Sequence, residues 1–169
     1  MGNPTERTET TNYAIKTIRA NLIAQGYTSA LLPSFIYVNI RLRTLLTDYL
    51  SPTREKWKET HAILSSLQFP RLLKYCKTYK LIDEGEREKL AKLADKRNYL
   101  AHESVLWRKL TQEDVNNIEQ HCQFAITFLK DTTSRTSYNS SEAKVTTIDA
   151  QTFPWVTLSS EFRRNPQET

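Results

Sequence analysis

Residues 33–50 read PSFIYVNIRLRTLLTDYL, and this stretch decides how the rest of the chain must fold. Proline is accepted in the first turn of a helix, so Pro33 predicts a helix that runs on to Leu50. Apolar side chains fall on most sides of that helix rather than on one stripe, and this breadth is typical of a helix surrounded by others. The sequence therefore predicts the central, buried helix of a bundle, or a helix that a second subunit covers in part.

Helical patterns with start signals lie on both sides of this stretch. Asp83 and Glu86 have the spacing of a capping box, and Thr111 with Asp114 marks another helix start. The other predicted helices cover residues 11–25, 51–67, 69–81, 83–102 and 111–130. Because the chain of 169 residues is long enough for one domain with a core, we expect an all-α fold, a single bundle of about five to six helices.

The two ends of the chain differ in composition from the middle. Residues 1–10 are polar and are expected to form a flexible N-terminal arm. From residue 132 to residue 147, nine of sixteen residues are Ser or Thr, which is typical of a linker. The segment that follows contains Phe153-Pro154-Trp155 and is expected to dock on the bundle or on a partner. The predicted organisation is thus an arm, a helical domain over 11–131, and a linker with a docking tail over 132–169.

Composition excludes several kinds of protein and site. With only three glycines, the chain lacks the glycine-rich loops by which kinases, GTPases and dehydrogenases hold phosphate. Cys76 and Cys122 have no metal-ligand spacing, and no apolar run is long enough to span a bilayer. We therefore expect no metal, no cofactor, no membrane partner, and a cytoplasmic protein with reduced thiols. The net charge is +5, and residues 53–80 hold seven Lys or Arg against two Glu, which indicates a polyanionic partner.

The candidate site is the segment Arg97-Asn98-Tyr99-Leu100-Ala101-His102. Arg97 falls in the middle of the apolar stripe of its predicted helix. A guanidinium in that position needs an anion, because arginine is seldom buried without one. The anion is either an acid of the fold, such as Asp48, Glu88 or Asp95, or a phosphate that reaches Arg97 at an interface.

The three polar side chains of this segment do not point the same way. Asn98 and His102 are four residues apart and are neighbours on one flank of the helix. Arg97 and His102 diverge by about 140° on an ideal helix. A kink, the long reach of arginine or a second subunit must therefore bring the cation and the imidazole to one phosphate, and we expect a homodimer.

An arginine, a polar residue and a histidine in this spacing, late in an all-helical domain, resemble the motif of the HEPN superfamily. The resemblance covers the helical layout from about Thr11 to Lys130 and maps the motif onto Arg97, Asn98 and His102. Members are small helical domains, and many are metal-independent endoribonucleases of toxin–antitoxin, phage-abortive and CRISPR systems, with the active site at a dimer interface. The resemblance thus implies a nuclease of the hydrolase class that acts on RNA as a toxin or a phage-defence effector.

The motif side chains suit the cleavage of RNA without a metal, because the 2′-hydroxyl of RNA is an internal nucleophile beside the phosphorus. Histidine titrates near neutrality and can move a proton, and arginine can hold two phosphate oxygens through parallel hydrogen bonds. We assign proton transfer to His102, clamping of the phosphate to Arg97, and orientation of His102 or of the phosphate to Asn98. The expected product is a 2′,3′-cyclic phosphate.

Two alternatives stay open in the sequence. Around the helix predicted for residues 69–81, the cations either contact the RNA backbone or form an ordinary solvated face, and they are Arg71, Lys74, Lys77 and Lys80. The whole chain is either the nuclease or a catalytically inactive module of the same fold that binds RNA, a nucleotide or a protein. In a variant of the second interpretation it is the interaction subunit of a two-protein system, with an antitoxin or another protein held by Phe153-Pro154-Trp155.

Overall fold

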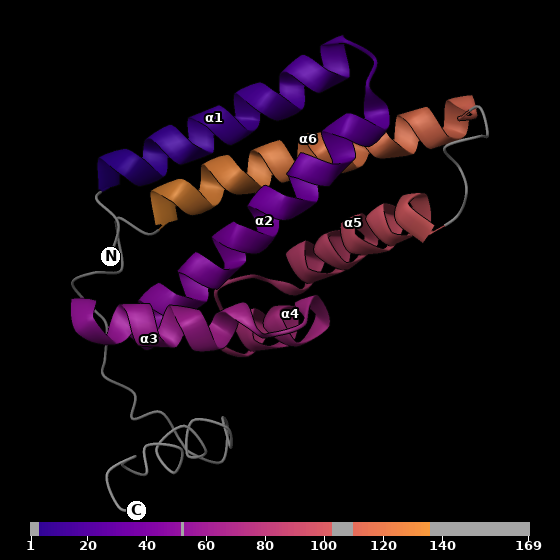
Figure 1. The fold of residues 1–169 in the computed structure, drawn as a ribbon. Coiled ribbons are helices and arrows are strands. Elements are labelled where there is room, and N and C mark those ends of the chain that lie inside the picture. Colours follow the sequence, from indigo (N-terminus) through magenta and orange to yellow (C-terminus); the bar gives the residue numbers. More distant parts are fainter. Residues whose placement is uncertain (1–3, 52, 103–109, 136–169) are drawn as a thin grey trace, which may run out of the picture.

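The central helix of the bundle is α2 (Tyr27–Leu50), which packs against each of the other five helices of the described chain (Figure 1). The computed structural model describes residues 4–51, 53–102 and 110–135. The buried positions of α2 lie on several of its sides, and they are Ala30, Leu31, Ser34, Phe35, Val38, Arg41, Leu42, Leu45, Leu46 and Thr47. This arrangement confirms the central helix predicted from residues 33–50.

The other helices complete an all-α bundle, and the described residues contain no strand. They are α1 (Pro4–Ile23), α3 (Arg54–Ser65), α4 (Phe69–Thr78), α5 (Glu84–His102) and α6 (Gln112–Arg135). α1 and α6 lie side by side and both pack on α2, while α3, α4 and α5 pack on α2 away from α1 (Figure 1). α5 also contacts α4 and α6. The core therefore forms around α2, and the predicted fold class is confirmed.

α2 begins at Tyr27, so Pro33 lies inside the helix rather than in its first turn as predicted. A proline inside a helix removes a backbone hydrogen bond and is unfavourable by about 3 kcal/mol. The turn before it buries Ala30 and Leu31 in the core, and burial of a leucine side chain contributes about 1.5–3 kcal/mol. The hydroxyl of Ser34 also donates to the carbonyl oxygen of Ala30 at 2.7 Å. The beginning of α2 is thus set by core packing, which cannot be read from a helix-start residue such as Pro33.

α1 also begins earlier than predicted, at Pro4 rather than at residue 11. Arg7 explains the difference: its Nη1 donates to Oδ2 of Asp48 at 2.6 Å, and its Nη2 donates to Oδ1 at 3.0 Å. This bidentate pair ties the first turns of α1 to the last turn of α2. The structure therefore differs from the flexible arm expected over residues 1–10, because residues 4–10 are helical.

α6 extends to Arg135, past the domain boundary predicted at residue 131. The buried side chain of Arg41 donates from Nε to Oγ1 of Thr132 at 3.2 Å and from Nη2 to the carbonyl oxygen of Thr132. Burial, and then the charge of Arg7, lower the pKa of Arg41 to about 10, so the guanidinium stays charged at neutral pH. These bonds hold the end of α6 against the middle of α2. The predicted linker and docking tail beyond residue 135 lie outside the described residues.

Candidate active site at the end of the fifth helix

α5 holds the three motif residues in its last two turns. A capping box fixes its start: the amide of Asp83 donates to Oε2 of Glu86 at 3.0 Å, and the amide of Glu86 donates to Oδ1 of Asp83 at 2.7 Å. Reciprocal caps of this kind satisfy two amides that the first turn of a helix leaves unpaired. The predicted start is confirmed, and the helix runs without interruption to His102.

The side chain of Arg97 is half-buried where α5 meets α2. Its guanidinium carbon lies 5.0 Å from the centre of the Phe35 ring, which is a cation–π contact. Its Nη1 donates to Oδ1 of Asn98 at 2.9 Å. An aromatic ring from α2 and an amide from the next residue of α5 therefore both contact the guanidinium.

In the described part of the chain, no carboxylate forms an ion pair with Arg97. Asp48, which the sequence offers as a partner, instead pairs with Arg7 and accepts from Nε1 of Trp57 at 2.8 Å. Glu88 and Asp95, the other two acids that the sequence offers, are both exposed. Arg97 is therefore not one of the structural ion pairs of the bundle, and within the described residues its guanidinium also lacks the backbone carbonyl partner that Arg41 has in Thr132.

Four buried polar side-chain atoms of the described residues have no hydrogen-bond partner, and two of them belong to Arg97 and Asn39. One is the donor Nε of Arg97, and the other is the acceptor Oδ1 of Asn39, which follows Phe35 by one turn of α2. A buried polar atom left unpaired is unfavourable by about 1–3 kcal/mol, and such atoms call for an explanation in ligand or catalytic terms. The sequence did not single out Phe35 or Asn39 as site residues; its one signal is a carboxamide between Val38 and Ile40.

The structure brings Arg97 and Asn98 into contact and places Asn98 on the exposed surface of α5. His102 is the last residue of α5, and its side chain lies outside what the structure describes. Since residues four apart are helical neighbours, the backbone places His102 on the flank of Asn98. Arg97 and His102 belong to one uninterrupted helix and therefore lie about 140° apart around its axis.

The four cations predicted to bind RNA lie on α4 and just after it, and all are exposed. Arg71 and Lys74 form no ion pair with a described residue. Lys77 pairs with Glu84 at the start of α5, and this bond is the first cause of the lowered pKa of Glu84. Lys80 follows the helix with a left-handed backbone, at a φ of 56°. The predicted set therefore lies exposed on one helix and the turn after it, but Lys77 is already paired with an acid.

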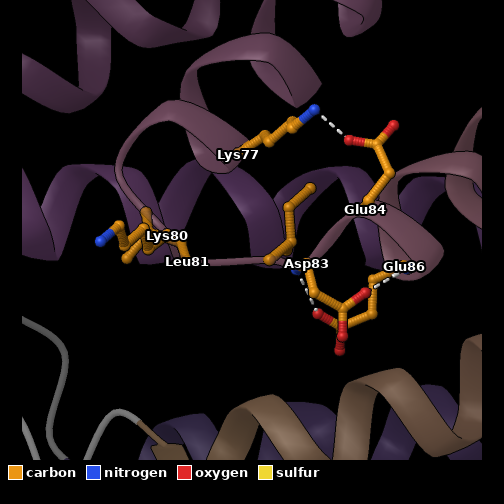
Figure 2. Close-up of a pocket in the computed structure, with 7 residues that line it drawn as sticks. Lys77, Lys80, Leu81, Asp83, Glu84 and Glu86 are labelled. Carbon is orange, nitrogen blue, oxygen red and sulfur yellow. Dashed lines mark hydrogen bonds and ion pairs between the residues drawn. The ribbon is translucent and has the colours of Figure 1, made fainter.

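A hollow of about 350 Å³ lies where α4 turns into α5 (Figure 2). Figure 2 shows Lys77 turned toward Glu84, and Lys80 pointing away from the carboxylates of Asp83 and Glu86. The three acids outnumber the two lysines among the residues that line it. This balance does not suit a phosphate, so the hollow is not an extension of the predicted RNA-binding face.

Comparisons of the chain with protein-family models, with curated proteins and with solved structures found no match. Within the described residues, no three His, Cys, Asp or Glu side chains gather as a metal site requires, and no helix has the length and apolar character needed to cross a membrane. Cys76 and Cys122 are buried free thiols, and burial raises the pKa of Cys76 to about 12. What the chain does is therefore inferred from the residues around Arg97.

Proposed function

We propose that the chain is a metal-independent endoribonuclease of the HEPN type, a cytoplasmic toxin or phage-defence effector that cleaves RNA through its own 2′-hydroxyl. One observation supports this function above the others. Arg97 is a half-buried cation that no described carboxylate neutralises, in cation–π contact with Phe35 and bonded to Asn98, five residues before a histidine. A phosphate is the anion that this arrangement lacks.

The proposed chemistry divides between the motif residues. Arg97 holds two nonbridging oxygens of the scissile phosphate and stabilises the charge that develops there. Its contacts with Phe35 and Asn98 fix the guanidinium before the substrate arrives, which lowers the entropic cost of forming two parallel bonds. His102 transfers the proton between the 2′-hydroxyl and the leaving 5′-oxygen. The products are a 2′,3′-cyclic phosphate, or the monophosphate formed by its hydrolysis, and a 5′-hydroxyl.

An RNA-cleavage assay in excess EDTA tests this function. The full-length protein is expected to cut a single-stranded RNA, to leave a 2′,3′-cyclic phosphate end, and to spare the same sequence made as DNA, which lacks the nucleophile. Mass spectrometry of the fragments identifies the ends. Cleavage that appears only after Mg²⁺ or Mn²⁺ is restored, or equal cleavage of the DNA strand, contradicts the mechanism. Binding of RNA without cleavage supports the inactive module instead.

We further propose that the active site is completed by a second copy of the chain. Three apolar side chains four residues apart form an exposed line on α2, here called the α2 stripe: Leu32, Ile36 and Ile40, which are 46%, 43% and 48% exposed. Phe35, whose ring contacts the guanidinium of Arg97, precedes Ile36 in the sequence. Large exposed apolar surfaces mark interaction sites. A two-fold related copy is the occupant that fits, because Arg97 and His102 of one chain diverge around α5 and need a facing helix.

The dimer predicts a specific effect of charge on the α2 stripe. Ile36→Glu is expected to turn a dimer into a monomer in sedimentation velocity at micromolar concentration, with unchanged helical content and with loss of RNA cleavage. Ile23→Glu is the matched control, because Ile23 is 84% exposed at the end of α1 and lies outside the stripe. A wild-type protein that sediments as a monomer and still cleaves RNA would falsify the shared site.

A further inference from the structure

α5 packs on α6 (Figure 1), and lysines and aromatic rings lie along this contact, here called the α5–α6 seam. It consists of Lys89, Lys92, Lys96 and Tyr99 from α5 and of Asp114, His121 and Phe124 from α6. Nζ of Lys89 lies 5.5 Å from the centre of the Phe124 ring, and Nζ of Lys96 lies 5.1 Å from the centre of the Tyr99 ring. The seam thus alternates cations with aromatic rings over about 15 Å of α5.

The seam has a net positive charge, and two of its three lysines form no ion pair with a described residue. Lys89 and Lys92 are exposed and form no ion pair with a described residue. Asp114 is the one carboxylate of the seam, and it is already engaged by Lys96 at 2.9 Å and by the hydroxyl and amide of Thr111. These bonds, that with Lys96 first, lower the pKa of Asp114 to about 2. Two lysines therefore remain for an outside anion.

His121 lies half-buried within this positive field. Burial, and then the charges of Lys96 and Lys92, lower its pKa, so the imidazole is neutral at pH 7. The charged groups that act on the ring come from α5, and Asp114 on its own helix is held by Lys96. A neutral imidazole can still donate one hydrogen bond. His121 lies beside these two lysines only because α5 packs on α6, so its role is not visible in the sequence.

We propose that the α5–α6 seam binds the sugar–phosphate backbone of single-stranded RNA and leads the strand to the motif at the end of α5. Lys89 and Lys92 contact successive phosphates, His121 donates a hydrogen bond to one of them, and the exposed ring of Tyr99 stacks on a base. Tyr99 lies within the motif segment, two residues after Arg97. That the ligand is RNA rests on the proposed function, whereas the location of the site rests on the contacts between α5 and α6.

Two charge-matched double variants test the seam in the full chain. Binding of a fluorescent 2′-O-methyl RNA, which cannot be cleaved because its 2′-oxygen is blocked, is measured by anisotropy at several salt concentrations. Each lysine–phosphate contact on a single strand contributes about 0.7 to the slope of log affinity against log salt, so Lys89→Ala with Lys92→Ala should reduce the slope by about 1.4. Lys16→Ala with Arg19→Ala removes the same charge from exposed positions of α1, outside the seam and the α4 cations, and should leave the slope unchanged.

A second measurement reports on the ligand directly. Phosphates in the seam stabilise the imidazolium, so the pKa of His121 in an NMR titration should rise when the 2′-O-methyl RNA binds, and the Lys89/Lys92 double variant should lose this rise. An unchanged His121 titration on binding, or a slope lowered by the α1 variant and not by the seam variant, overturns the proposal. Because neither measurement needs cleavage, seam-dependent binding by a protein that does not cut RNA would refute the nuclease and leave the seam standing.

Discussion

His102→Ala is expected to slow RNA cleavage by about 10²–10⁴-fold, which is the usual contribution of general acid–base catalysis. His102 is the last residue of α5, and alanine has a higher helix propensity than histidine, so helical content should not fall. Binding of the uncleavable RNA should survive, since proton transfer takes no part in it. Single-turnover cleavage in EDTA measures the rate, and circular dichroism on the same samples measures the helical content.

Arg97→Lys should also impair cleavage, although it keeps the positive charge. Lysine lacks the planar fork that makes two parallel bonds to a phosphate, and Arg97→Lys also removes the guanidinium that contacts Phe35. Arg87→Lys is the matched control on the same helix, because Arg87 pairs with Glu84 three residues away and lies outside the motif. If Arg97 acted only through its long-range charge, Arg97→Lys would cleave RNA as fast as Arg87→Lys.

The double variant separates one shared active site from two independent effects. If Arg97 and His102 stabilise the same transition state, their combined loss is smaller than the product of the single losses. Fully multiplicative effects would assign the two residues to different steps. Wild-type cleavage rates in His102→Ala, or a wild type that needs a divalent metal, would remove the assignment altogether and favour the RNA-binding module.

Periodicity and capping signals were sufficient to predict the helices and the place of α2. The Asp83–Glu86 box is formed as predicted, because both of its bonds are local and depend only on residues three apart. Boundaries set by distant contacts could not be predicted in the same way. The bidentate pair between Arg7 and Asp48 joins residues 41 apart in the sequence. It holds the first turns of α1, which begins at Pro4 and not at the predicted residue 11.

The site shows the same division between local and tertiary information. The helical spacing of Arg97 and Asn98 is visible in the sequence, and so is the apolar stripe around Arg97. Its missing carboxylate, its contact with Phe35 and the unpaired oxygen of Asn39 depend on how α5 packs on α2. The pairing of Lys77 with Glu84 likewise depends on the turn between α4 and α5.

Leu42→Ala is expected to lower the free energy of unfolding by about 2–5 kcal/mol, the range for a leucine removed from a filled core. Leu42 has no exposed surface, and it lies on the one helix that contacts all the others in the described chain. The surrounding helices cannot all close the resulting gap, because α1, α4, α5 and α6 each also pack on a neighbour other than α2. Urea denaturation followed by circular dichroism measures the loss.

Ile23→Ala is the control for this substitution, because leucine and isoleucine lose the same number of carbon atoms. Ile23 is 84% exposed at the end of α1, so its truncation should change the free energy of unfolding by no more than about 0.5 kcal/mol. Two variants that differ only in burial then isolate packing around α2 as the source of stability. Equal losses from the two variants would show that α2 is not the centre of the core, and the placement of Arg97 against Phe35 would lose its support.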